Sequence, residues 1–232
     1  MALRTDQGIV LRAYPFGESH RVVILVSAAR GKIRTVAKGV RKTKSRFGGR
    51  LEPLTHVEVV LYEGRDLDTI TQVDVIEAYP NLRMDLDAVA LAATMAEVVD
   101  HVAHEEEPSS ALFLSLRRGL LALESGERGP DVLSRFLLGV TDSLGLAPSF
   151  DTCASCGSSD VHKFSFPAGG AVCESCAPGG AVRLRDGVLD HLDALRVGDE
   201  VDEQTAGESL GVLRRFVEYH LEKRFSSLAV PS

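Results

Sequence analysis

The sequence predicts an α+β protein of several domains: a five-stranded β-barrel at the N-terminus, then a helical domain into which a module with four cysteines is inserted. Three observations predict this class. Short runs rich in β-branched residues fill the first 80 residues, long runs rich in Ala and Leu follow, and the four cysteines form two close pairs. With 232 residues, 44% of them hydrophobic, the chain can bury one large core or two modest ones.

The barrel is predicted from five strand-like runs that are bounded by turn residues. These runs are residues 8–14, 21–27, 32–37, 56–62 and 67–79. In the fourth run Val57, Val59 and Leu61 fall on one face, as the two-residue period of a strand requires. Five short strands with no helical pattern longer than one turn are typical of a small closed barrel of the OB type. We therefore expect a first domain over residues 1–80.

The residues after Pro80 predict helices, because apolar side chains recur there at three- and four-residue spacing. The helical runs are residues 84–106, 109–125, 130–145 and 209–228. Ser109 or Ser110 is expected to cap the second helix. Pro130 is expected in the first turn of the third helix, and Gly145 at its end.

Thr205 and Glu208 have the T-x-x-E spacing of a capping box before the fourth helix. We expect all four helices to pack as one antiparallel bundle. The helical domain then has two parts, residues 81–149 and 183–232, separated by the cysteine module at residues 150–182.

The cysteine module contains the most specific local pattern of the sequence. Two C-x2-C pairs are separated by sixteen residues, and they consist of Cys153, Cys156, Cys173 and Cys176. This spacing is typical of a tetrahedral four-thiolate site for one Zn²⁺ ion, with a short hairpin between the pairs. Two disulfides would need an oxidising compartment, and unrelated buried cysteines would not explain the paired spacing. Because sulfur fills all four positions, the expected zinc is structural and not catalytic.

Charge is distributed unevenly along the chain. Residues 1–80 contain 13 Lys and Arg against 9 Asp and Glu, a net charge of +4, whereas residues 81–232 contain 13 against 24, a net charge of −11. Within the first part, residues 30–50 carry nine Lys and Arg and no Asp or Glu. Such asymmetry indicates a basic working surface on one domain and an acidic remainder.

The basic run begins on the third predicted strand and continues into a loop flanked by glycines. Lys and Arg at such a place suit contacts with the phosphates of a nucleic acid, and an aromatic ring there can stack on a base. A solvated loop without a ligand is the alternative. The candidate phosphate-binding residues are Lys32, Arg34, Lys38, Arg41, Lys42, Lys44, Arg46 and Arg50, with Phe47 as the candidate stacking residue.

Other motifs give little support for an enzyme. The seven histidines are scattered, and the sequence lacks the G-x-G-x-x-G, P-loop, G-x-S-x-G and H-E-x-x-H patterns. It also lacks an uncharged apolar stretch of roughly 20 residues and the apolar region of a signal peptide, so we expect a cytoplasmic protein without a membrane partner.

Several segments of the first 80 residues resemble the RecO family of bacterial DNA-repair recombination mediators. They are "YPFGESHR" at 14–21, "GKIRTVAKGVRK" at 31–42, "SRFGGRLEP" at 45–53 and "GRDLDTITQ" at 64–72. The resemblance continues through the helical region to the four cysteines, so that it covers nearly the whole chain.

The resemblance implies an OB-fold, a helical domain and a zinc module in one nucleoid-associated protein of the RecF pathway. It further implies binding of single- and double-stranded DNA and annealing of complementary strands. The expected partners are RecR, with which the protein would load RecA, and the acidic C-terminal tail of single-strand-binding protein. "LRRG" at 116–119 and "LRRF" at 213–216 are the candidate grooves for that tail.

Two other classes of function remain open. A zinc-ribbon regulator of transcription would also combine basic residues with four cysteines, but its cations should surround the ribbon, and residues 153–176 contain only Lys163. A zinc hydrolase would need an open position on the metal.

Overall fold

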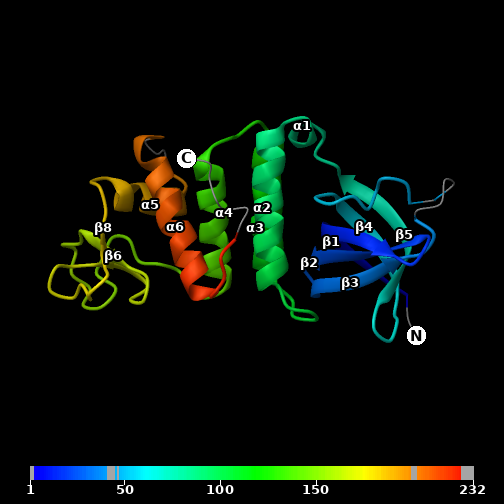
Figure 1. Cartoon of the computed structure of the whole chain (residues 1–232), viewed down its shortest axis with the longest axis horizontal. Coiled ribbons are helices and arrows are strands. Elements are labelled where there is room, and N and C mark those ends of the chain that lie inside the picture. The colour runs from blue at the N-terminus through cyan, green and yellow to red at the C-terminus, as the bar shows by residue number, and fades with distance from the viewer. Residues whose placement is uncertain (1–2, 41–44, 46, 200–202, 226–232) are drawn as a thin grey trace. The chain divides into compact units, whose positions relative to one another are not determined.

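The computed structural model describes residues 3–40, 45, 47–199 and 203–225 (Figure 1). The chain divides into two compact units, Met1–Glu127 (unit 1) and Arg128–Ser232 (unit 2). Within the described ranges, none of the helices combines the length and the apolar character that a membrane crossing needs.

Five strands of unit 1 form a closed barrel. They are β1 (Leu3–Phe16), β2 (His20–Ser27), β3 (Gly31–Ala37), β4 (His56–Tyr62) and β5 (Asp68–Glu77). The strands follow one another around the barrel in the order β1, β2, β3, β5, β4, and β4 pairs again with β1. The β3–β5 pair is parallel and the others are antiparallel. All five predicted strands are therefore confirmed.

β1 begins at Leu3, five residues before the predicted start, because it pairs with two neighbours. Its first part lies against β4, with Leu3 opposite Tyr62, and its last part lies against β2, with Phe16 opposite His20. A register shift between Val10 and Arg12 lies just after the part of β1 that pairs with β4. A bulge of this kind bends a strand and increases its twist, which is how one strand can serve both sides of a small barrel.

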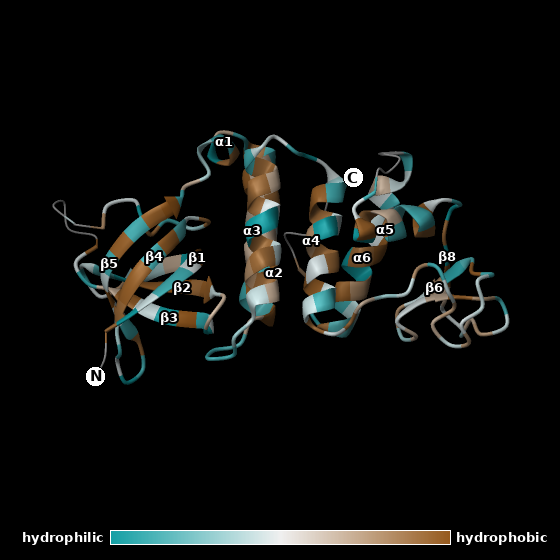
Figure 2. Cartoon of the chain, turned by 180° about the vertical axis from the view of Figure 1, so that it is seen from behind, coloured by the Kyte–Doolittle hydropathy of each residue, from teal (hydrophilic) through white to brown (hydrophobic). Residues whose placement is uncertain are grey.

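The barrel interior is filled by aliphatic side chains and one aromatic ring. Figure 2 shows the hydrophobic residues concentrated along the strands. The connection between β3 and β4 also contributes Phe47 and Leu51, which are 2% and 1% exposed. The core consists of Val10, Val23, Leu25, Ile33, Ala37, Val40, Phe47, Leu51, Val57, Val59, Leu61, Ile70 and Val73.

Three helices complete unit 1: α1 (Pro80–Arg83), α2 (Leu86–Val102) and α3 (Ser110–Glu124). The side chain of Asp85 accepts hydrogen bonds from the amides of Asp87 and Ala88, so α2 starts two residues later than predicted. Ser109 caps α3 as expected by accepting from the Leu112 amide. α2 contacts β1, and α3 contacts β1 and β2, so both helices pack on the barrel.

Unit 2 contains α4 (Pro130–Ser143), α5 (Val188–Val197), the short 3₁₀ helix η1 (Glu203–Thr205) and α6 (Ala206–His220). It also contains a sheet of β6 (Lys163–Ser165), β7 (Gly170–Val172) and β8 (Val182–Arg183), with β6 in the middle. α4, α5 and α6 pack on one another. α2 and α3 belong to unit 1, and α4 and α6 belong to unit 2, so one bundle of all four helices stays a prediction.

Local signals at the ends of these helices had mixed outcomes. Pro130 occupies the first turn of α4 and Gly145 follows its end with φ 69°, as predicted. The prediction of a capping box before α6 was wrong, because the side chain of Thr205 makes no capping hydrogen bond. The carboxylate of Glu208 instead accepts from the amide and guanidinium of Arg185.

Candidate metal centre and nucleic-acid interface

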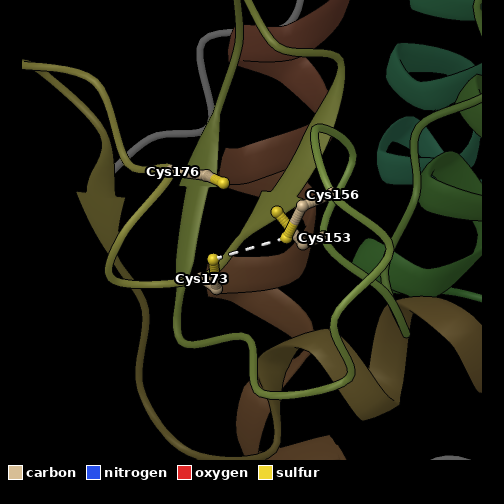
Figure 3. A group of neighbouring side chains, drawn as sticks. All are labelled: Cys153, Cys156, Cys173 and Cys176. Atoms are coloured by element: carbon tan, nitrogen blue, oxygen red, sulfur yellow. Dashed lines mark hydrogen bonds between the residues drawn. The ribbon is translucent and has the colours of Figure 1, made fainter.

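The four cysteines converge at one end of the β6–β7 hairpin (Figure 3). Each C-x2-C pair sits on a tight turn. The amide of Gly157 donates to the carbonyl of Cys153 over 2.8 Å, and the amide of Ala177 donates to the carbonyl of Cys173 over 3.0 Å. Gly157 adopts φ 76°, a conformation that glycine allows at little cost. The predicted hairpin between the two pairs is confirmed.

The geometry of the sulfur atoms fits a tetrahedral metal ion. All four Sγ atoms lie within 4.8 Å of one another, and those of Cys156 and Cys173 are 3.8 Å apart. Sulfur ligands at 2.3 Å from a tetrahedral zinc ion would be separated by about 3.8 Å. All four cysteines are free thiols, so the disulfide alternative is wrong. The cluster can therefore hold a metal ion of the kind that thiolates bind.

Hydrogen bonds shift the pKa values of Cys153, Cys173 and Cys176 in different directions. The amide of Cys173 is the main cause that lowers the pKa of Cys153 to about 6. The hydroxyl of Ser175, 3.1 Å from the Cys173 sulfur, lowers the pKa of Cys173. In contrast, the neighbouring sulfur of Cys156 raises the pKa of Cys176 to about 12. Hydrogen bonding thus favours the thiolate form at Cys153 and Cys173 and opposes it at Cys176.

Aromatic rings pack the cysteine module against the helices of unit 2. Phe164 on β6 is fully buried, and its ring lies 6.3 Å from that of Phe150 and 5.9 Å from that of Phe216 on α6. The guanidinium of Arg196, on α5, covers Phe150 at 4.8 Å. A metal that fixes the hairpin would therefore also fix the position of Phe164 against α6.

Two of the candidate cations on β3 already have acidic partners. Lys32 donates through Nζ to the backbone carbonyl of Asp100 on α2 and lies 3.5 Å from its carboxylate. Arg34 Nε lies 3.7 Å from Glu105 Oε1. The basic run itself contains no acidic residue, and these partners come from α2 and the segment after it, about 70 positions along the chain. Their role in binding phosphate stays a prediction.

The backbone of the segment after α2 lies unusually close to the backbone at the start of β3. The amide of Lys32 donates to the carbonyl of His104 over 2.9 Å. Gly31 has φ 68°, and a Cβ on it would lie 2.0 Å from the carbonyl oxygen of Glu107. Only glycine fits this approach.

The remaining candidates are in the connection after β3. Lys38 and Arg50 are exposed. Arg50 also lines a cavity of about 300 Å³ with Phe47 and β5 residues that include Thr71 and Gln72. The other four candidates, Arg41, Lys42, Lys44 and Arg46, lie outside the described residues.

Phe47 is not a surface residue, which corrects its predicted role. Its side chain is 2% exposed and belongs to the barrel core. A ring in this position stabilises the fold by removing apolar area from water, and it is not available to stack on a base. The apolar residues Leu51 and Leu54, four and seven positions later, were the signal that this connection turns inward.

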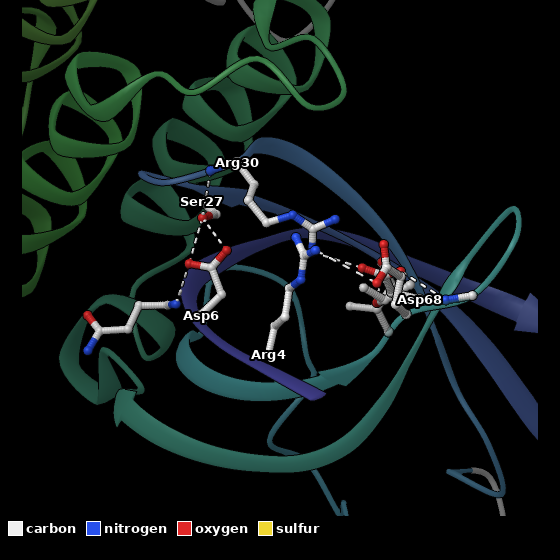
Figure 4. A network of polar contacts seen from close by, with 10 residues as sticks. Arg4, Asp6, Ser27, Arg30 and Asp68 are labelled. Atoms are coloured by element: carbon white, nitrogen blue, oxygen red, sulfur yellow. Dashed lines mark hydrogen bonds and ion pairs between the residues drawn. The ribbon is translucent and has the colours of Figure 1, made fainter. Parts of the chain in front are cut away.

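One further cation of the basic run has a structural role (Figure 4). Arg30 Nη1 lies 2.8 Å from Asp68 Oδ2 at the start of β5, and its amide donates to the hydroxyl of Ser27. That hydroxyl in turn donates to Asp6 on β1 over 2.8 Å. The network joins the β2–β3 turn to two other strands, so Arg30 is engaged within the barrel.

Comparison with known proteins gives the class and then the family. The family model described as "Recombination protein O N terminal" matches residues 1–79, and "Recombination protein O C terminal" matches residues 83–229. Both descriptions, and the names of the relatives, denote a recombination and repair protein and not an enzyme.

Three relatives are named DNA repair protein RecO. The chain is 39% identical to that of Frankia casuarinae, 41% to that of a Nocardioides species and 38% to that of Thermobifida fusca, in each case over 98% of both chains. The chain therefore belongs to the RecO family.

Proposed function

We propose that this chain is a DNA repair and recombination mediator of the RecF pathway that binds single- and double-stranded DNA on its N-terminal barrel. It anneals complementary strands and, with RecR, helps to load RecA onto DNA coated with single-strand-binding protein. The observation that carries the proposal is the likeness, over 98% of both chains, to relatives named DNA repair protein RecO. This role would place the chain in the cytoplasm, at the nucleoid.

The barrel supports this proposal. Its strand order, with a parallel β3–β5 pair, is the reason to assign it to the OB type, a fold that binds oligonucleotides. The basic connection after β3 would carry most of the phosphate contacts. Lys38 and Arg50 are exposed at its two ends. Lys32 and Arg34 would have to leave Asp100 and Glu105 before they contact phosphate.

A direct test is to mix the purified protein with complementary oligonucleotides and follow annealing without nucleotide, with a scrambled pair as the negative reaction. If about five cations reach phosphates, the log–log dependence of single-strand affinity on salt should have a slope near −3.5. A zinc-ribbon regulator of transcription, the alternative, would bind a specific duplex and would not anneal strands.

Charge reversal tests the surface. We expect the triple variant Arg41→Glu, Lys42→Glu and Lys44→Glu to lose binding and annealing and to keep its zinc. A matched control reverses the exposed Arg118, Arg183 and Arg224 and changes the net charge by the same amount. If the first variant binds as tightly as the parent at equal salt, the DNA surface lies elsewhere.

We further propose that the cysteine cluster holds one structural zinc ion. The donor set and the 3.8 Å separation of two sulfurs support this metal. Zinc would link the two turns covalently through its ligands, and no step of DNA binding passes through it.

The tail of single-strand-binding protein has a candidate groove in unit 2. A cavity of about 300 Å³ is lined by Phe166, Leu184 and Leu210, with Arg214 and Arg215 at the same place. Apolar walls beside cations suit an acidic peptide with an apolar end, which favours "LRRF" at 213–216 over "LRRG" at 116–119. Calorimetry with the tail peptide should show binding that Arg215→Glu abolishes; no heat from the parent protein would reject the groove.

A further inference from the structure

Two aromatic side chains near the end of β1 are exposed on the outside of the barrel. Tyr14 is 37% exposed and Phe16 is 50% exposed. They are two residues apart in a strand, so their side chains lie on the same face. Their partners on β2 are Val22 and His20. Ala13, between Arg12 and Tyr14, packs on the barrel core, which places Tyr14 and Phe16 on the outer face.

A cation lies over one of these rings. Arg12 shares their face: its guanidinium carbon is 5.8 Å from the centre of the Tyr14 ring, and its Nε pairs with Asp100 Oδ2 over 2.7 Å. Lys38 directly follows β3 and is exposed. The next residue, Gly39, donates its amide to His20 Nδ1 over 2.9 Å, so the basic connection leaves β3 beside the partner of Phe16. We call Arg12, Tyr14, Phe16, His20 and Lys38 the aromatic patch.

We propose that the aromatic patch is a stacking platform for the unpaired bases of single-stranded DNA. The proposal rests on the DNA binding proposed above and adds the residues that hold bases to those that hold phosphates. Aromatic rings beside cations form the usual combination in grooves for single strands, because every base has a face that can stack. Bases in a duplex already stack on one another, so the patch should favour single strands without sequence preference.

The charge beside the rings decides between occupants. Exposed aromatic rings also occur at protein interfaces. Here, however, they adjoin the start of a connection in which residues 38–50 contain six Lys and Arg and no Asp or Glu, within a chain of net charge −7. A polyanion is the complementary ligand, and DNA is the polyanion that also offers aromatic faces.

The absence of Trp from the sequence allows a direct test. Phe16→Trp places a single indole on the patch, and stacking on a base should quench its fluorescence strongly when oligo(dT) is added. Tyr62→Trp is the matched control, since Tyr62 is 40% exposed and lies opposite Leu3, at the other end of β1. An oligonucleotide of abasic deoxyribose phosphates should bind without quenching.

A loss-of-function variant completes the test. Tyr14→Ala with Phe16→Ala should weaken single-strand binding about tenfold per ring and leave the salt slope unchanged, because stacking releases no counterions. Replacing Phe16→Ala by Phe16→Tyr should restore the affinity for single strands, because the tyrosine keeps an aromatic ring. Unquenched Phe16→Trp fluorescence at saturating DNA would overturn the stacking role while DNA binding stands, and quenching by a protein partner but not by DNA would assign the patch to that partner. If the parent protein binds no DNA at low salt, the proposed function itself fails.

Discussion

The β-barrel and the cysteine module are held together by different means. Among the described residues, thirteen side chains form the barrel core. The buried cluster of the module contains only Val172 and two of the cysteines, Cys153 and Cys173, and its strands are two or three residues long. Apart from this cluster and the rings of Phe150 and Phe164, little apolar area is available to offset the conformational entropy of ordering about 30 residues. The comparison teaches that burial suffices for the barrel, whereas we expect the module to depend on the proposed zinc ion.

The largest expected effect follows from removal of that metal. Elemental analysis should find about one zinc ion per chain. Cys153→Ser or Cys176→Ser should abolish it and lower solubility and thermal stability, because metal binding at such sites is folding free energy, on the order of 10 kcal/mol in zinc-finger peptides. Hydrogen exchange should show that the amides of β6 and β7 lose protection, whereas those of β1–β5 keep it. Ser155→Ala, at an exposed position within the first pair, is the control. A metal-free chain with unchanged stability would contradict the comparison.

A smaller effect on stability is expected from a substitution in the barrel core. Phe47→Ala should destabilise the protein by about 3–5 kcal/mol, because it removes a buried ring and leaves a cavity. Phe16→Ala, at an exposed ring, should change stability by only about 0.5 kcal/mol. Urea unfolding measures both, and zinc content should stay the same in each variant. Equal effects of the two substitutions would show that Phe47 does not belong to the core.

Low pH should reduce the stability of unit 1 because of His56. This residue is buried beside Phe113, with ring centres 5.5 Å apart, and burial followed by the charge of Arg117 lowers its pKa below 6.5, although Glu77 opposes this. Since the unfolded chain then binds the proton more tightly, the stability contribution is complete above pH 6.5 and falls as the pH drops below it. Urea midpoints at pH 7.5 and 5.5 should differ less in His56→Phe than in the parent, and an unchanged difference would exclude His56 as the cause.

The smallest effect on stability is expected at the partner of Arg34. Both side chains of the Arg34–Glu105 pair are about half exposed, so Glu105→Gln should cost no more than about 1 kcal/mol. It should nevertheless make Arg34 available to DNA and steepen the log–log salt dependence by about 0.7. Glu106→Gln, at the neighbouring exposed position, is the control. An unchanged salt slope would mean that Arg34 does not reach phosphate.

Much of the fold was predictable because local patterns determine it. Alternation identified the strands, and helical spacing with Ser109 and Pro130 identified α3 and α4. The first residues of β1 were missed because "LRTDQ" lacks an apolar alternation and is a strand only through its pairing with β4. α5 was missed because it has ten residues and carries three charged side chains, so its apolar stripe is short.

The two sites were predictable to different degrees for a physical reason. A metal site needs particular atoms at short spacing, so all four cysteines could be named from the sequence. A phosphate surface needs only free positive charge, and whether Lys32 is free depends on Asp100, 68 positions away. Position in the sequence likewise could not separate Phe47, which points into the barrel, from Phe16, which points out.

The double pairing of β1 has a consequence for the order of events during synthesis. The residues at its start find their partners only in β4, where Leu3 meets Tyr62, and the parallel contact of β3 needs Thr69 of β5. The ribosome must therefore release most of the first 77 residues before the cylinder can close. Until then the first half of β1 is an open edge, which another nascent chain can capture. Rapid translation of the segment up to β5 would shorten that exposure.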